Sequence, residues 1–169
     1  MITFSHRIAG VAALAALATF AIADGDWPAL RGPNQDGSAA RGTRFGAGEG
    51  ALAVRWRARL GSGYSGIAVS GGKAVTMFSD GARDVLAAFD VATGKEAWRV
   101  PIAEGHRGFD GSFDGPIGTP AIAGGRVFAL GPRGHLVAAD LATGRVSWRV
   151  DVAERDGARK PHYLSLIHI

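Results

Sequence analysis

The sequence predicts an all-β protein built from a repeated unit, because one stretch of the chain returns in similar form fifty positions later. Segments Leu86–Val100 and Leu136–Val150 share nine of their fifteen residues in the same order. The chain also has 26 glycines among its 169 residues, which suits many short strands joined by tight turns. A period of this size is the pattern of architectures made of stacked repeats.

Each copy of the repeat predicts a strand, a tight turn and a second strand. Aspartate accepts hydrogen bonds from the amides that follow it, threonine does so more weakly, and glycine takes a positive φ without steric cost. The tryptophan beyond the turn can fill the gap to a neighbouring unit. Small alanines before the turn allow backbones to approach closely. We expect a structural repeat motif of Ala88, Asp90, Thr93, Gly94, Trp98, Ala138, Asp140, Thr143, Gly144 and Trp148.

Two complete units of four antiparallel strands are predicted, and a Gly-Gly hairpin turn follows the first strand of each. Four such strands make one blade of a β-propeller, so the predicted fold is a partial β-propeller with about two full blades and one extra strand. The predicted blade strands are Ile67–Ser70, Lys73–Phe78, Val85–Asp90 and Glu96–Pro101, then Thr119–Ala123, Arg126–Leu130, Leu136–Asp140 and Val146–Val152.

The extra strand is expected at Leu52–Leu60, where apolar and polar residues alternate with a period of two. Its Trp56 would correspond to Trp98 and Trp148 as a tryptophan of an outer strand. This strand would belong to a blade whose other strands the chain lacks.

The pattern Ala-x-Asp-x-x-Thr-Gly-Lys/Arg-x-x-Trp, present at Ala88–Trp98 and Ala138–Trp148, resembles the tryptophan-docking motif of pyrroloquinoline-quinone (PQQ)-type β-propeller repeats. That quinoprotein-like family includes alcohol dehydrogenases and non-catalytic propellers, among them an outer-membrane assembly lipoprotein. The resemblance covers roughly Leu52 to Val152 and identifies blades rather than a substrate.

The first 23 residues have the features of a secretory signal peptide. His6 and Arg7 precede an apolar run from Ile8 to Phe20, and Ala21-Ile22-Ala23 fits the small-x-small cleavage rule. The alternative is an uncleaved anchor, but the run is short for a span of about 20 residues. We therefore expect export to the periplasm or the outside of a bacterial cell, with no membrane span after cleavage.

An irregular segment, 24–51, is expected between the signal peptide and the blades at 52–163. Its sequence from Trp27 through Arg31 to Gly37 is similar to the opening of many secreted PQQ-like propellers. One interpretation gives Arg31 an anion to bind. The favoured one has Trp27 packing on a blade as a latch, with Arg31 in solvent or paired locally.

The connection between the two blades, Ile102–Pro116, is the stretch most typical of a functional loop, since sites usually lie on loops held by a rigid scaffold. Asp110, Ser112 and Asp114 match the opening of a calcium loop in part, but Ala121 stands where the bidentate acid belongs. We expect no metal site there, and we expect His106 to be a solvated loop residue.

The C-terminal residues bear on whether the chain is a fragment of a longer protein. The charged run 153–161 is expected to be a solvated connection to a further blade. Leu164–Ile169 is interpreted as translated sequencing adaptor, because its codons can spell a transposon end sequence. With about two blades where a ring needs four to eight, the chain is predicted to be an N-terminal fragment.

The composition of the chain limits the kinds of partner that it is expected to bind. The chain has no cysteine, which excludes disulfides and cysteine-held metals, and its formal charge of +4 comes from scattered residues rather than a basic run. We expect a protein or cell-envelope partner and no nucleic acid.

Three functions stay open. The favoured one is an exported scaffold or binding module without catalytic residues in this fragment. The second, implied by the resemblance alone, is a PQQ-dependent alcohol or sugar dehydrogenase with quinone and calcium near the ring axis; no cofactor-binding residue is assigned. The third is a propeller fused to another domain.

Overall fold

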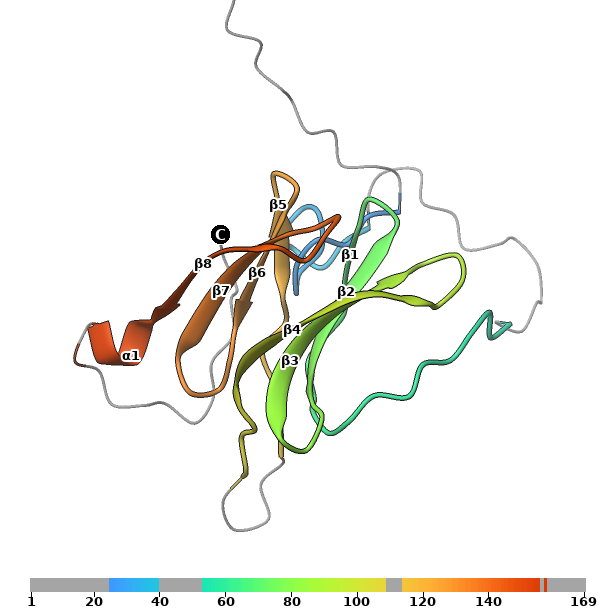
Figure 1. Cartoon of the computed structure of the whole chain (residues 1–169). Coiled ribbons are helices and arrows are strands. Elements are labelled where there is room, and N and C mark those ends of the chain that lie inside the picture. The colour runs from blue at the N-terminus through green and yellow to red at the C-terminus, as the bar shows by residue number, and fades with distance from the viewer. Residues whose placement is uncertain (1–24, 40–52, 109–113, 156, 158–169) are drawn as a thin grey trace, which may run out of the picture.

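Two four-stranded antiparallel sheets make up most of the structure, a computed structural model that describes residues 25–39, 53–108, 114–155 and 157 (Figure 1). The first sheet has the order β1-β2-β3-β4 and the second β5-β6-β7-β8. We call them the first and second blades. This is the predicted architecture: an all-β chain with two consecutive blades of a β-propeller.

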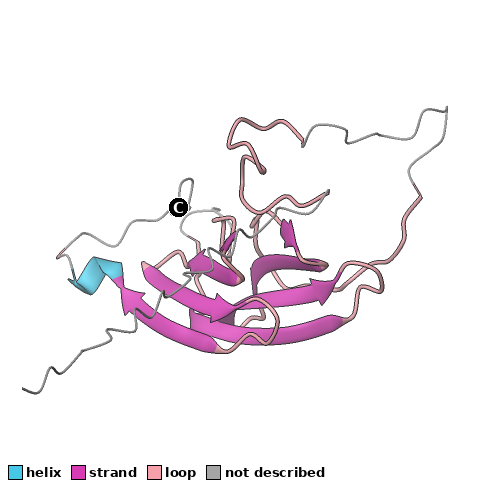
Figure 2. Cartoon of the chain, turned by 90° about the horizontal axis from the view of Figure 1, so that it is seen from above, coloured by secondary structure: helices cyan, strands magenta, loops and turns pink. Residues whose placement is uncertain are grey.

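The strands follow the chain in order. The first blade contains β1 (Ala68–Ser70), β2 (Lys73–Ser79), β3 (Arg83–Asp90) and β4 (Glu96–Glu104). The second contains β5 (Ala121–Ala123), β6 (Arg126–Leu130), β7 (His135–Asp140) and β8 (Val146–Asp151), followed by the helical turn α1 (Val152–Arg155). Viewed from above, the two sheets lie side by side (Figure 2).

The two blades share one register. Ala88 pairs with Trp98 in the first blade and Ala138 with Trp148 in the second, and a register shift follows each alanine. Because the strands pair identically, residues can be matched between blades along β3–β4 and β7–β8.

The main core lies between the blades. It unites Met77, Leu86 and Trp98 of the first blade with Val127 and Val137 of the second in one buried cluster. Ala88 and Ala138 are fully buried within their sheets. Apolar residues of one blade are therefore withdrawn from water mainly by the next blade, as expected of stacked repeats.

Each blade has two ends that differ in the loops they carry. We call the hairpin end the one with the turns β1–β2, β3–β4, β5–β6 and β7–β8, where the amide of Val91 bonds Gly72 and that of Leu141 bonds Gly125. The loop end carries the turns β2–β3 and β6–β7 and the connection from β4 to β5, where the amide of Gly105 bonds Ala82.

The prediction of a strand at Leu52–Leu60 is wrong for its described part, since residues 53–60 form no strand. Val54 and Leu60 are exposed there. A strand is stabilised by the ladder it forms with a neighbour, and no described segment pairs with residues 53–60. The alternation of apolar residues is real, but it lacks the partner that would turn it into a strand.

The boundaries of other strands shift by a few residues. β4 continues past Pro101 to Glu104, because Arg83 and Asp84 extend β3 and supply partners. Proline is tolerated there, since it lies on an outer strand beside a register shift. The first strand of the second blade starts at Ala121 rather than Thr119, after Pro120, and β8 ends at Asp151, where α1 begins.

Among the residues that the structure describes, no helix is long and apolar enough to cross a membrane. The predicted signal peptide, 1–23, and the predicted adaptor-derived residues, 164–169, lie outside the described part of the chain.

Candidate functional site

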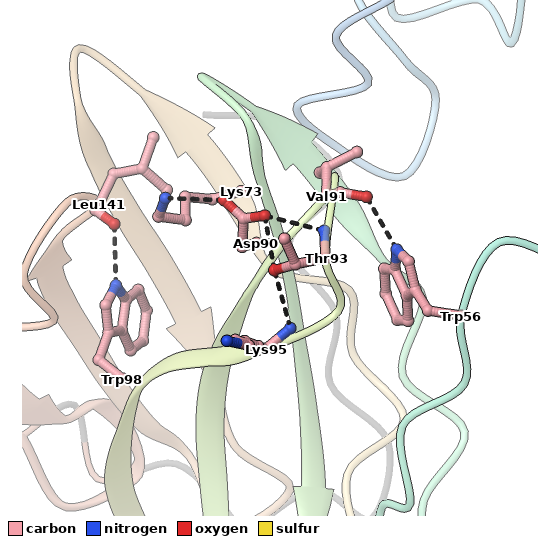
Figure 3. A network of polar contacts seen from close by, with 8 residues as sticks. All are labelled: Trp56, Lys73, Asp90, Val91, Thr93, Lys95, Trp98 and Leu141. Atoms are coloured by element: carbon pink, nitrogen blue, oxygen red, sulfur yellow. Dashed lines mark hydrogen bonds and ion pairs between the residues drawn. The ribbon is translucent and has the colours of Figure 1, made fainter.

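The repeated turn at the hairpin end is closed by its own side chains. Oδ1 of Asp90 accepts hydrogen bonds from the amide and the hydroxyl of Thr93, both at 2.9 Å (Figure 3). Oδ1 of Asp140 accepts the same two bonds from Thr143, at 2.8 and 2.6 Å. The threonine hydroxyl and amide stabilise the ionised carboxylate and hold the pKa of both aspartates below its ordinary value. Asp90 and Asp140 therefore serve to close their turns.

Each of these turns receives a tryptophan from the preceding segment of the chain. Nε1 of Trp98 donates a 2.9 Å hydrogen bond to the carbonyl oxygen of Leu141 in the second blade. Trp56 makes the same bond, at 2.8 Å, to Val91 in the first blade (Figure 3). Trp56 thus takes the tryptophan position of a preceding blade although its segment is not a strand.

Glycine is required beneath each ring. Gly94 has φ +71° and Gly144 has φ +73°, a conformation that side-chain-bearing residues rarely adopt. A Cβ at Gly94 would lie 2.5 Å from the ring of Trp56, and one at Gly144 would lie 2.7 Å from the ring of Trp98. The glycine therefore serves both the turn and the contact between units.

The N-terminal segment crosses the innermost strands of both blades. Trp27 and Val69 exchange two backbone hydrogen bonds of 2.8 Å, and the carbonyl oxygen of Pro28 accepts a bond from the amide of Ile122. The ring of Trp27 covers Gly32, and Arg31 is exposed. The segment is thus held to both blades by its backbone, while the ring of Trp27 packs on its own segment rather than on a blade as predicted.

At the loop end, the connection between the blades is tied to a buried carboxylate. Asp84 is fully buried and accepts hydrogen bonds from the amide of His106 at 3.1 and 3.2 Å and from the hydroxyl of Ser79. Burial raises the pKa of Asp84, and these hydrogen bonds lower it in part. His106 is half-buried, so the expectation of a solvated loop residue needs correction: its backbone anchors the connection.

Two hydrogen bonds join the two arms of the connection where it leaves the blade. The amide of Gly115 bonds the carbonyl of His106 at 3.0 Å, and the amide of Gly108 bonds Oδ1 of Asp114 at 2.9 Å. Residues 109–113, which include Asp110 and Ser112, lie outside the described part of the chain. The connection thus leaves the blade and returns to it at one point, as expected of a compact surface loop.

The loop end also carries polar contacts across the boundary between the blades. Arg133 forms an ion pair with Glu104 at 3.5 Å, and Nη1 of Arg149 donates a 3.4 Å bond to the carbonyl of Ile102. Beside them, Nδ1 of His135 lies 3.2 Å from Oδ2 of Asp151. Sequence analysis did not single out these residues. His135 and Asp151 nevertheless depart from the repeat, because the equivalent residues of the first blade are Val85 and Pro101.

The described residues are not assigned to the binding of calcium or of a quinone. These residues contain no group of three or more histidines, aspartates or glutamates placed to hold a metal ion. Asp114, the described aspartate of the partial calcium pattern, already accepts a bond from the amide of Gly108. Calcium requires six to eight oxygen ligands, so no chemistry of either group is assigned to these residues.

Consecutive four-stranded blades, joined by a tryptophan that binds the turn of the next unit, define a repeat protein of the β-propeller class. A family model described as outer membrane protein assembly factor BamB matches residues 44–164. The chain belongs to this family of PQQ-like repeat proteins. No curated protein matches it.

Several solved structures are similar to the chain. BamB from Moraxella catarrhalis shares 23% identity over 58% of this chain and 27% of that one, with a TM-score of 0.44. A europium-containing methanol dehydrogenase shares 27% identity over 50% of this chain and 14% of its own (TM-score 0.39). Quinohemoprotein alcohol dehydrogenase ADHIIG from Pseudomonas putida HK5 shares 29% over 49% of this chain and 12% of its own (TM-score 0.37). The chain spans about a quarter or less of these proteins.

Proposed function

We propose that this chain is part of an exported β-propeller that acts as a scaffold and binding module in the bacterial cell envelope. The family match with an outer-membrane assembly factor supports this role, because such a factor works through other proteins. In this proposal residues 1–23 are a signal peptide, 24–51 form the N-terminal segment, and 52–163 carry the blades. The location is then periplasmic or secreted.

The observation that carries the proposal is the anchored connection at the loop end. Its first residues are fixed by the buried Asp84, and its two arms are tied by the Gly115–His106 bond. Arg107 is exposed between these anchors. The described residues at the base of the connection are already fixed, so they lose little conformational entropy when a partner binds, which favours protein recognition.

The hairpin end has the opposite character in this proposal. Its turn residues serve to build and join the blades, since the turn aspartates are occupied by threonine and the turn glycines are covered by Trp56 and Trp98. The hairpin end therefore builds the scaffold, and the loop end meets the partner.

Charge reversal at the two ends tests the assignment. In the full-length exported protein, Arg107→Glu at the loop end should weaken co-purification of an envelope partner identified by mass spectrometry. Arg126→Glu is the matched control, because Arg126 is also exposed and is the first residue of β6, at the hairpin end. Equal effects of both variants, or an effect of Arg126→Glu alone, would contradict a loop-end interface.

The alternative activity is a quinone-dependent alcohol or sugar dehydrogenase. Full-length protein incubated with PQQ and calcium should neither retain the quinone through gel filtration nor reduce an artificial electron acceptor with alcohols or sugars. Tight quinone retention with substrate-dependent dye reduction would overturn the scaffold proposal.

A further inference from the structure

The face of the second blade that meets the first is polar at its loop end, where the same face of the first blade is apolar. In the first blade Val85 pairs with Pro101, and Val85 lies in a small buried cluster with Phe78 and Phe89. At the identical register position the second blade pairs His135 with Asp151. The two blades otherwise share their pattern, so this departure marks a difference in what the position contacts.

The two equivalent arginines differ in the same way. Arg99 of the first blade binds Glu96 through Nε at 3.1 Å and Nη2 at 2.6 Å, and its guanidinium lies 5.0 Å from the ring centre of Phe78. Arg149 has Val146 where Arg99 has Glu96. Among the described residues no carboxylate lies within ion-pair distance of Arg149, and its hydrogen bond is the 3.4 Å contact to the carbonyl of Ile102.

These differences open a crevice between the blades. It has a volume of about 320 Å³ and is lined by Ile102, His135, Arg149, Val150 and Asp151. That volume lies at the lower end of the range for small-molecule sites, about 300–1,000 Å³. Ile102 contributes an apolar side chain to the crevice, and Arg149 and His135 contribute the guanidinium and the imidazole.

Asp151 is engaged on both of its oxygens. Oδ2 lies 3.2 Å from Nδ1 of His135, and Oδ1 accepts the amide of Glu154 at 3.0 Å. A carboxylate on Nδ1 fixes the orientation of the ring and its tautomer. Asp151 therefore holds His135 in place, with the Nε2 atom as the free nitrogen of the ring.

We propose that this crevice binds the oxyanion group of a small organic molecule, a carboxylate or a phosphate, whose apolar part lies against Ile102. Arginine presents a planar fork of donors that suits such groups, and Arg149 is exposed, so a ligand can reach it. His135 supplies a second contact beside it. The ligand would bridge the blades, because Ile102 belongs to the first and the polar residues belong to the second.

The test is a titration of the full-length protein with sodium benzoate, phenyl phosphate and inorganic phosphate at constant ionic strength, followed by calorimetry and by the NMR signals of the histidine rings. We expect saturable binding of at least one organic probe, with shifts at His135 and not at His106. Preference for benzoate or for phenyl phosphate separates the carboxylate from the phosphate source. Binding of inorganic phosphate alone, or no saturable binding at millimolar concentrations, would overturn the proposal.

Matched variants locate the site. Arg149→Met should weaken binding at least tenfold, whereas Arg99→Met, at the equivalent position of the first blade, should leave it within twofold. His135→Val introduces the residue that the first blade has at this position, so this variant should fold even if Arg149→Met does not. It should weaken binding severalfold. Equal losses in Arg149→Met and Arg99→Met, or unchanged affinity in His135→Val and Arg149→Met, would place the ligand elsewhere.

Discussion

Trp98 and Trp148 occupy the same register position in the two blades, yet their surroundings differ. Trp98 is 9% exposed and bonds Leu141 of the next blade, whereas Trp148 is 40% exposed and meets Phe128 of its own blade with ring centres 6.1 Å apart. The fifteen-residue segments that contain them, Leu86–Val100 and Leu136–Val150, share nine residues. The difference shows that a tryptophan of this repeat is buried by the turn of the following unit and not by its own sheet.

The face that each blade turns toward the preceding unit adds a second contrast. Toward the preceding segment, the first blade presents an apolar cluster of Phe78, Val85 and Phe89, against which Trp56 packs. The second blade presents apolar residues at the hairpin end and a polar crevice at the loop end. The two blades thus share the residues that join them and differ at the loop end, where we propose the ligand and partner sites.

The largest expected effect is at the tryptophans themselves. Trp98→Ala should destabilise this chain by about 3–5 kcal/mol, as for a large core aromatic, because it removes packing between the blades. Trp148→Ala should cost less than about 2 kcal/mol, since much of its ring already contacts water. Urea unfolding measures both. Equal costs would mean that Trp148 is covered as Trp98 is, and the contrast between the blades would fail.

Glycine substitutions sharpen the same contrast. Gly144→Ala should cost about 2–4 kcal/mol, because it combines a left-handed backbone with a clash against the ring of Trp98. Gly124→Ala is the control: it has φ +55° but nothing within 4 Å of a new Cβ, so only the backbone strain of about 1–2 kcal/mol applies. If the two variants melt alike, the ring does not rest on Gly144 in solution.

The two ends of the blades should respond to pH with opposite sign. The pKa of Asp140 is lowered in the folded state, so its contribution is present above the ordinary aspartate pKa and is lost as pH falls through the folded value. The pKa of Asp84 is raised, so the folded state binds its proton more tightly, and stability falls as pH rises through the interval above the ordinary value.

Unfolding of Asp140→Asn and Asp84→Asn between pH 3 and 7 checks these signs. The stability advantage of the parent over Asp140→Asn should shrink as pH falls, and that over Asp84→Asn should grow. Asp84→Ala should cost about 1–3 kcal/mol, because it leaves the amide of His106 without an acceptor. The same pH slope in both asparagine variants would contradict the assignment of a buried carboxylate at the loop end.

The smallest effect on stability is expected at the two equivalent arginines, Arg99 and Arg149. Arg99→Ala should cost about 0.5–1 kcal/mol through its ion pair with Glu96 and its contact with Phe78. Arg149→Ala should cost less than about 0.5 kcal/mol, a typical value for a surface residue without a charged partner. Thermal melts of both variants suffice. A larger loss at Arg149 would show that this residue holds the blades together.

Much of the fold could be predicted because the repeat carries local information. Asp90, Thr93 and Gly94 close their turn with bonds among near neighbours, so their residue types predict the hairpin. The failure at 53–60 has the opposite cause. Alternation predicts a strand, but a strand also needs a partner, and the described chain offers Trp56 a turn to bind and no neighbour with which to form a ladder.

The polar crevice was beyond sequence analysis for a similar reason. His135, Arg149 and Asp151 are separated along the chain and belong to no motif, and Ile102 comes from the other blade. The signal was a deviation between the two repeats, Val85 and Pro101 against His135 and Asp151, which acquires meaning once the register shows that these pairs are equivalent.

By itself, the sequence determined the all-β class, the two four-stranded units and the turns that close them, since these depend on side chains within a few residues of one another. The tertiary structure decided which tryptophan is buried, which carboxylate is withdrawn from water, and where the blades leave a polar crevice. Burial and electrostatics depend on residues brought together from distant positions. Trp98 and Trp148 show this most directly, because a similar local sequence leaves one ring covered and the other in contact with solvent.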